Sequence, residues 1–236
     1  MGKHYKFSKW LFSFFLIAIS TSIIFFLHSC KNVLDKTDEG SIEYEITYAD
    51  SMKNDIMYSI LPSKMFLKFK PDFTLNELKM GMGIITASFI ANAENKTLTS
   101  LFKVVDKKYA LKFTPLQTTK ELNKLPKFSI KYVSETKQIA GYKCKKAIAT
   151  EIGNEVNSFP IFYTTDIHLK NPNWNSPYPE ITGVLMEYQL VHNDIAMQVT
   201  AKKVELEDLD DAIFTASEEY KVVQKEELPE IIQDFF

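Results

Sequence analysis

Residues 41–48 read SIEYEITY, and this stretch indicates the fold class more directly than any other part of the chain. Its apolar side chains recur at every second position, with Glu or Thr side chains between them. A repeat of two places alternate side chains on opposite faces of a β-strand, so that one face is buried and the other meets water. Residues 64–70, KMFLKFK, repeat the pattern with Met65, Leu67 and Phe69 on the apolar face. The two stretches predict a sheet with one buried face.

The same alternation continues along most of the chain. Short polar turns separate about ten such stretches, so an antiparallel meander is the arrangement we expect. The expected strands span residues 41–48, 64–70, 78–84, 86–91, 98–105, 108–114, 128–133, 142–150, 159–164, 182–191 and 196–206. Helical patterns are few. Residues 116–125 predict a short helix before Pro126, and residues 226–236 predict an amphipathic helix packed on the domain, with a frayed tail as the alternative.

The N-terminal 30 residues have the parts of a secretory signal. Lysines precede an apolar run from Trp10 to Leu27, and the run ends in Leu27-His28-Ser29-Cys30. Leucine three residues before a cysteine and a small residue just before it resemble the lipobox of bacterial lipoproteins, although His28 departs from the usual small residue. An uncleaved membrane anchor is the alternative, because this run spans about 27 Å at about 1.5 Å per residue. The Ser-Cys ending favours cleavage before Cys30 and lipid attachment to it.

These features divide the chain into a signal peptide (1–29), a flexible lipidated tether (30–40) and a single β-rich domain (41–236). More than one acyl chain, such as palmitate, on a cysteine anchors a protein stably in a membrane. Lys31 follows the cysteine, whereas Asp at this position resembles the inner-membrane retention signal of enterobacteria. We therefore expect a protein of the cell envelope whose lipid is held by the outer membrane, facing the periplasm, with exposure at the cell surface as the alternative.

Charge and motif content limit the classes of function. Residues 30–236 contain 25 lysines, no arginine and 30 acidic residues, a formal net charge of −5, and nucleic-acid binding needs a basic surface. The chain contains no Walker loop, dinucleotide fingerprint, HExxH helix or GxSxG elbow. Two His/Asp pairs, Asp166 with His168 and His192 with Asp194, are interpreted as surface polar residues because further metal ligands are missing. The sequence therefore predicts no nucleic-acid partner, no metal, no cofactor and no enzyme.

Cys144 is the one cysteine that remains if Cys30 carries lipid, so no disulfide is expected. Lys143, Lys145 and Lys146 flank it and would lower the pKa of the thiol, as a nucleophile requires. No histidine lies near it in the sequence, and it falls within a predicted strand. A small buried residue is the favoured interpretation.

The segment Asn171–Pro179, NPNWNSPYP, interrupts the strand pattern with three prolines and three asparagines. Trp174 and Tyr178 supply large aromatic rings to what must be a loop. Two interpretations remain open. The loop forms the lip of a ligand pocket, or its aromatic rings seal one end of the core.

From about Ser41 onward the chain resembles a lipoprotein family of Bacteroidota that has an unassigned role and a fold like that of the lipoprotein carriers LolA and LolB. The segment from Ile139 to Ala147, IAGYKCKKA, is similar to the family's signature Ile-x-Gly-Tyr-x-Cys-x-Lys-Ala. Further similarities are Phe162-Tyr163-Thr164-Thr165-Asp166, Ile181-Thr-Gly183-Val-Leu185, Phe214 and Tyr220. These motifs look structural, and no catalytic residue is carried over from the family.

The resemblance implies a mainly β fold with some α-helix, in which a curved antiparallel sheet, an incomplete barrel, wraps around one or more helices. In carriers of this fold the concave face holds acyl chains. Candidate ligand-binding residues on that face and its loop are Met65, Leu67, Phe69, Met80, Met82, Phe102, Trp174 and Tyr178. The first hypothesis is therefore a lipoprotein that binds a lipid or another hydrophobic ligand. The second is a structural lipoprotein that docks another envelope protein, and its apolar stripe is then an ordinary core.

Overall fold

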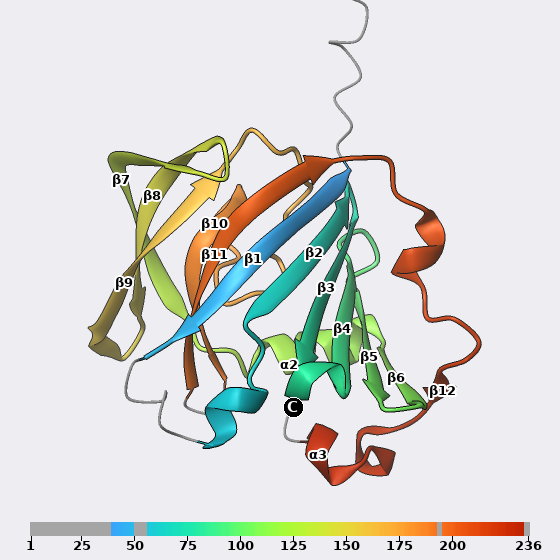
Figure 1. Cartoon of the computed structure of the whole chain (residues 1–236). Helices are drawn as coiled ribbons and strands as arrows, with labels where there is room; N and C mark the ends of the chain where they lie inside the picture. Colours follow the sequence, from blue (N-terminus) through green and yellow to red (C-terminus); the bar gives the residue numbers. More distant parts are fainter. Residues whose placement is uncertain (1–38, 50–55, 193–194, 234–236) are drawn as a thin grey trace, which may run out of the picture. The chain divides into compact units, whose positions relative to one another are not determined.

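The computed structural model describes residues 39–49, 56–192 and 195–233, which belong to one compact unit that spans residues 38–236. Cys30, the signal peptide and almost all of the tether lie outside these residues. Within the described part, twelve strands form one sheet in the order β12-β6-β5-β4-β3-β2-β1-β11-β10-β9-β8-β7 (Figure 1). All neighbouring strands are antiparallel except β12, which lies parallel to β6. The expected antiparallel arrangement is confirmed, but the sheet consists of two meanders, β1–β6 and β7–β11, which are joined where β1 pairs with β11.

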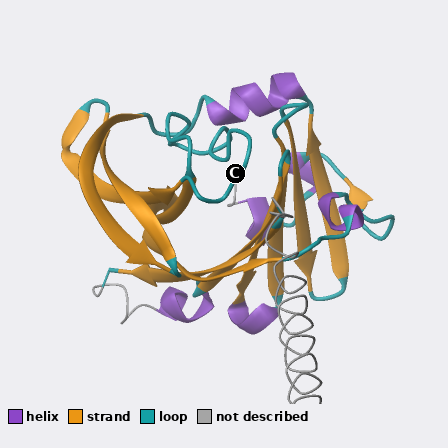
Figure 2. Ribbon diagram, turned by 90° about the horizontal axis from the view of Figure 1, so that it is seen from above, coloured by secondary structure: helices purple, strands orange, loops and turns teal. Residues whose placement is uncertain are grey.

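The sheet curves strongly and stays open, so that it surrounds a set of loops without closing into a barrel (Figure 2). Register shifts interrupt the pairs β1–β11, β9–β10, β7–β8 and β8–β9, and bulges of this kind increase local twist and bending. The strands are β1 Gly40–Tyr48, β2 Lys64–Lys70, β3 Phe73–Met80, β4 Ile85–Asn92, β5 Thr97–Val104, β6 Lys107–Phe113, β7 Phe128–Ile139, β8 Tyr142–Glu151, β9 Asn154–Thr164, β10 Val184–His192, β11 Ile195–Leu206 and β12 Lys221–Val222. The predicted fold class, a curved antiparallel sheet with a minor helical part, is confirmed.

The helical elements are short. The helix α2, Pro115–Leu122, begins at a capping box in which the Thr114 hydroxyl accepts a hydrogen bond from the Gln117 N–H, with Pro115 in the first turn. It crosses the concave side of the sheet between β6 and β7 (Figures 1 and 2). Within the described residues, up to 233, the segment predicted as one helix over 226–236 forms a 3₁₀ turn η5 (Lys225–Glu227) and the helix α3 (Glu230–Gln233). Pro229 separates the two, since its missing N–H and fixed φ suit the start of a helix and not its middle. Three more 3₁₀ segments are η2 Ile56–Ile60, η3 Gly81–Gly83 and η4 Asp211–Phe214.

The concave face of the sheet is covered by the chain itself. On strands β1, β2 and β7–β11, buried side chains form a cluster with Ile167, Tyr178 and Ile181 of the β9–β10 loop. On strands β3–β6, a second cluster includes Val223, Leu228 and Ile232 of the C-terminal segment. The convex face of β4–β6 is covered by a third cluster around Phe214. The predicted apolar face is therefore a core with its own covering segments.

One predicted strand is wrong. The expected strand over residues 78–84 starts earlier, at Phe73, and ends at Met80. The chain then turns through Gly81–Gly83, where Met82 adopts a left-handed φ of 56° and its side chain is 98% exposed. The two glycines allow this tight turn. The alternation of apolar residues continues through it, and for that reason the sequence predicted a strand. Met82 therefore does not belong to the concave face and is removed from the candidate ligand residues.

The two neighbouring methionines should respond differently to truncation. Met80 is 9% exposed within the second core cluster, and Met82 is 98% exposed. We expect Met80→Ala to lower the free energy of unfolding by about 2–4 kcal/mol through lost burial and a cavity. Met82→Ala should change it by less than about 0.5 kcal/mol. Urea unfolding of both variants checks this, and equal losses would show that the turn is placed incorrectly.

Candidate functional site

The predicted ligand residues divide into three groups. Met65, Leu67, Phe69 and Tyr178 belong to the first core cluster, and Met80 and Phe102 belong to the second. Phe69 and Phe102 are fully buried. Met82 lies on an exposed turn, and Trp174 is half-buried at the rim of the sheet. Among the predicted ligand residues, Trp174 is thus the one whose ring is both held in place and reachable from solvent.

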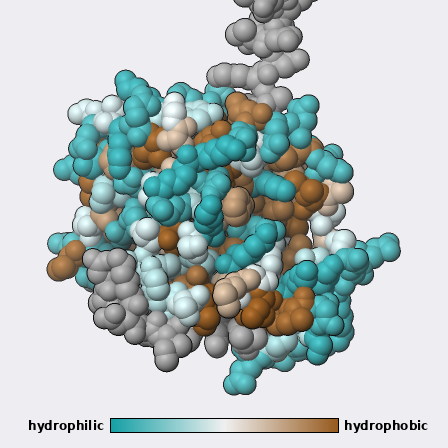
Figure 3. All heavy atoms as spheres, in the orientation of Figure 1, coloured by the Kyte–Doolittle hydropathy of each residue, from teal (hydrophilic) through white to brown (hydrophobic). Residues whose placement is uncertain are grey.

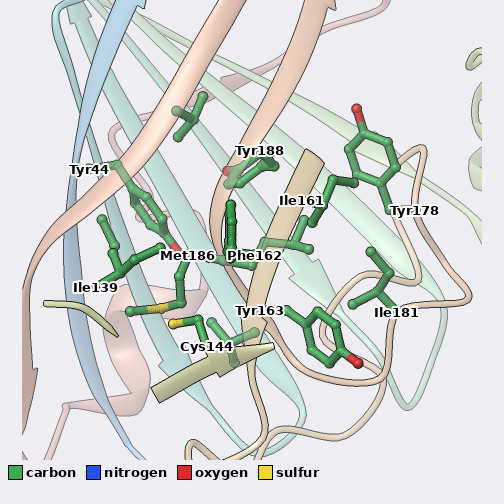
Figure 4. Packing of buried hydrophobic residues seen from close by; sticks show 14 of the residues in the cluster. Tyr44, Ile139, Cys144, Ile161, Phe162, Tyr163, Tyr178, Ile181, Met186 and Tyr188 are labelled. Carbon is green, nitrogen blue, oxygen red and sulfur yellow. Dashed lines mark hydrogen bonds between the residues drawn. The ribbon is translucent and has the colours of Figure 1, made fainter. Parts of the chain in front are cut away.

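The loop between β9 and β10, residues 165–183, inserts its Tyr178 into the concave side of the sheet. The ring of Tyr178 lies 5.2 Å from that of Phe128 and 6.3 Å from that of Phe159, between centroids. Its hydroxyl donates to the Gln189 carbonyl at 2.5 Å. Figure 4 shows Tyr178 and Ile181 on one side of the packed side chains, close to Ile161 and Tyr163. The aromatic part of the loop at Tyr178 therefore seals this region of the core.

The rest of this loop is held by a buried amide. The Asn173 side chain is 5% exposed and donates to the carbonyls of Ile181 (2.6 Å) and Gly183 (2.8 Å). The Ser176 hydroxyl donates to the Asn173 carbonyl at 2.9 Å. Satisfied buried hydrogen bonds of this kind fix one loop conformation, because breaking them would leave polar groups unpaired. Trp174 directly follows this anchor.

Trp174 lines a shallow depression formed by three segments that are distant in the sequence. The β2–β3 turn contributes Pro71 and Asp72, and the Lys170 N–H donates to the Pro71 carbonyl at 3.1 Å. The Lys170 ammonium lies 3.2 Å from the Asp72 carboxylate. Lys96, from the β4–β5 turn, places its ammonium 4.6 Å from the centroid of the Trp174 ring. The lining residues are Lys70, Pro71, Asp72, Phe73, Thr74, Ala91, Ala93, Leu169, Lys170, Asn171, Pro172 and Trp174.

Burial governs the ionisation of the groups inside the sheet. It raises the pKa of the Tyr44, Tyr178 and Tyr188 hydroxyls well above the ordinary value, so these groups stay protonated. The Tyr44 hydroxyl donates to the Leu185 carbonyl at 2.9 Å. Burial also raises the pKa of the Cys144 thiol to about 11, in spite of its three flanking lysines. The interpretation of Cys144 as a small buried residue is confirmed, since its side chain is fully buried.

The Cys144 thiol should resist labelling in the native state. In a Cys30→Ser chain it is the only thiol, and at pH 8 we expect Ellman's reagent to react with it only after urea is added. Below about pH 7.5 the thiol is protonated in both states. As the pH rises toward 11 the unfolded thiol ionises first, so the urea midpoint should fall over this range. Fast labelling of the native chain at pH 8 would contradict the burial.

The charged groups of the described residues form no metal site. In this part of the chain no group of three His, Cys, Asp or Glu side chains lies close enough to hold an ion, and no Asp or Glu side chain is buried. Asp166 and His168 lie on the exposed start of the β9–β10 loop. The side chain of His192 and all of Asp194 lie outside the described residues. No helix in residues 39–49, 56–192 and 195–233 is long and apolar enough to cross a membrane.

The convex face, seen in Figure 3, carries mostly hydrophilic side chains with scattered hydrophobic ones. Ion pairs connect neighbouring strands there, such as Lys64 with Glu43 at 2.5 Å and Lys202 with Glu45 at 2.8 Å. Pairs this exposed add little to stability, on the order of 0–1 kcal/mol each. This face gives no indication of a specific ligand, and the depression at Trp174 is the stronger candidate.

The fold and the site together define a mainly β domain with an open, curved sheet, a filled concave face and an aromatic depression at its rim. The sequence profile of the PNGase F-II N-terminal domain, described as "N-glycanase peptide, N-terminal domain", matches residues 82–226. The match covers more than half of the chain, and the chain belongs to this domain family. The expectation that the protein is not an enzyme is therefore corrected, because the family is that of an N-glycanase, which is an enzyme.

Two solved structures have partial similarity to this chain. That of PNGF-II is similar over 78% of this chain and 31% of its own chain, at 18% identity and a TM-score of 0.47. MucB in complex with MucA(peri) is similar over 81% of this chain and 60% of its own, at 10% identity and a TM-score of 0.32. The present chain thus corresponds to less than a third of the PNGF-II chain. No curated protein is similar enough in sequence to count as a relative.

Proposed function

We propose that this domain recognises N-glycosylated proteins or peptides outside the cytoplasm, as the binding part of an N-glycan-processing activity. The observation that carries the proposal is membership of the N-glycanase domain family over residues 82–226. The recognised partner is a glycoprotein of the envelope or its surroundings. The hypothesis of a protein-docking lipoprotein thereby becomes more specific, because its docked partner is a glycoprotein.

The packing of the concave face favours recognition by the surface over transport of a lipid. A carrier needs a cavity of several hundred cubic ångströms between sheet and helices. Here Met65, Leu67 and Phe69 pack against the chain's own strands and loop, and Phe102 packs under the C-terminal segment. Opening this space for an acyl chain would expose the same side chains that hold the sheet together. Lipid binding in the concavity is thus the less favoured proposal.

The anchor completes the proposal. A lipid on Cys30 would hold the domain in the cell envelope, at the outer membrane, through the tether of residues 30–40. Gly40 lies opposite Phe69 at the start of β1, next to the β2–β3 turn. The tether therefore joins the domain at the same end of the sheet as the Trp174 depression. Tritiated palmitate incorporation that is lost in a Cys30→Ser chain tests the anchor.

The test of recognition uses the full chain in detergent and a peptide that carries a single N-glycan. Isothermal titration calorimetry should detect binding of the glycopeptide and no binding of the same peptide after its glycan has been removed. The peptide without glycan is the matched control, because it differs only in the sugar. Equal heats for both peptides, or none for either, would contradict the proposed function.

A further inference from the structure

We propose that the depression at Trp174 is a carbohydrate-binding site, in which a sugar ring of the N-glycan stacks on the indole ring. This inference rests on the proposed function and assigns it a place on the molecule. The site consists of Trp174 with Asp72, Lys96, Lys170 and Asn171 around it.

The site is built before any ligand arrives. Asn173 fixes the loop from beneath through two hydrogen bonds to backbone carbonyls, and Asn171 adopts a left-handed φ of 47° that turns the chain toward Trp174. The turn that carries Lys96 is closed by Asn92, whose side-chain oxygen accepts from the N–H groups of Glu94 and Asn95. Groups held this way lose little conformational freedom on binding, so more of the contact energy appears as affinity.

The chemistry of the depression matches that of a sugar. One face of a pyranose ring presents C–H groups, which pack on an aromatic ring, while its hydroxyls need donors and acceptors at the rim. Trp174 offers the aromatic ring, and the Asp72 carboxylate offers acceptor oxygens beside the Lys170 ammonium. Phe73, Leu169 and Pro172 add apolar walls. A shallow site of this kind leaves most of an oligosaccharide in water, which suits a ligand with many hydroxyls.

Lys96 covers the face of the Trp174 ring on which the sugar stacks. Its ammonium lies 4.6 Å from the Trp174 centroid, on a side chain that is exposed and free to swing away. Stacking of a sugar on this face displaces the ammonium, and the cation–π contact is lost on binding. Removal of the lysine side chain should therefore strengthen binding, about two- to fivefold for an exposed contact.

The charges around the depression disfavour an anionic membrane surface as its ligand. Lys70 at its edge is paired with Glu39 at 3.2 Å and Asp211 at 2.5 Å, and Lys170 is paired with Asp72. Glu207 lies next to Glu39, with its N–H donating to the Glu39 carbonyl. Lys70 and Lys170 are thus matched by three carboxylates, so the site lacks the large basic surplus that anionic lipids attract. A neutral ligand with hydroxyls suits this balance better.

Trp174 itself reports on binding. The chain has two tryptophans, Trp10 and Trp174, so a Trp10→Phe chain leaves only the indole of the site. Titration of this full chain in detergent with the glycopeptide should shift and quench its emission, and the peptide without glycan should not.

Trp174→Ala should weaken binding, measured by calorimetry, about tenfold or more. Lys96→Ala should strengthen it about two- to fivefold. Met82→Ala, an exposed apolar change at the other end of β3, is the matched control and should leave binding unchanged.

The outcomes separate the inference from the proposed function. Glycopeptide binding that is equally strong in Trp174→Ala and insensitive to Lys96→Ala overturns the Trp174 site and leaves the proposed function standing. No glycopeptide binding by the parent chain overturns both. Sedimentation with vesicles of phosphatidylethanolamine and phosphatidylglycerol gives a further arm. If a chain without Cys30 lipid binds these vesicles and Trp174→Ala abolishes it, the depression is a membrane contact and the inference is overturned.

Discussion

Tyr178→Ala should lower the free energy of unfolding by about 3–5 kcal/mol, one of the largest losses available to a single substitution in this chain. Its ring packs against those of Phe128 and Phe159, and its hydroxyl donates to the Gln189 carbonyl. The substitution opens a cavity and leaves that carbonyl without its partner. Denaturation in urea, followed by circular dichroism, measures the loss.

Tyr178→Phe separates the two contributions. It keeps the ring contacts and removes only the hydrogen bond, so a loss of about 1–2 kcal/mol is expected. Trp174→Ala on the same loop is a further comparison. The Trp174 ring is half-buried, so its removal should lower the free energy of unfolding by less than Tyr178→Ala does. If Tyr178→Ala leaves stability unchanged, the loop does not seal the core, and the concave side is open for a ligand.

Gly183→Ala should lower the free energy of unfolding by about 3 kcal/mol, for a different reason. A Cβ atom at this position would lie 2.5 Å from the Thr164 carbonyl oxygen and 2.6 Å from the Tyr163 ring. Both belong to β9, so the start of β10 would have to move away from its neighbour. The Gly183 carbonyl also accepts a hydrogen bond from Asn173, and that bond anchors the Trp174 loop. We therefore expect lost stability together with weaker glycopeptide binding.

Gly141→Ala is the matched control for this prediction. Gly141 has a left-handed φ of 86°, and no atom lies within 4 Å of an added Cβ. Its cost is backbone strain alone, about 1–2 kcal/mol, with binding unchanged. Equal effects of the two substitutions on binding would contradict the role of Gly183 in positioning the loop.

Alternation in the sequence predicts most of the sheet because each strand buries one face against a covering segment. Residues 64–70 are predicted to the residue, since Met65, Leu67 and Phe69 recur at every second position and Phe66 is the one apolar side chain on the other face. The strand Phe73–Met80 is largely missed because its concave face includes Thr74 and Asn76 near the rim, where partial exposure relaxes the pattern. The strand β12, two residues long and parallel to β6, depends on long-range pairing that local periodicity does not record.

The candidate site was predictable only in part. The composition of Asn171–Pro179 marks a loop with unusual aromatic content, and Trp174 is indeed at the rim. The sequence left open whether this loop forms a lip or a seal; in the structure Tyr178 is buried in the core, and Trp174 lines the depression at the rim. Asp72 and Lys96 carry no signal in the sequence, since they come from ordinary polar turns that the curvature of the sheet brings to Trp174. The apolar stripe alone could not decide between a pocket and a filled core, because both give the same alternating pattern.

We propose that this domain binds a glycan at its surface and carries no lipid inside its sheet. Native mass spectrometry of the full chain, released from detergent after incubation with glycopeptide, the same peptide without glycan, and phospholipid in one mixture, tests it most directly. We expect a single adduct with the mass of the glycopeptide, and its loss in Trp174→Ala. A phospholipid adduct of defined mass that survives in Trp174→Ala and disappears in Tyr178→Ala, without any glycopeptide adduct, would contradict it.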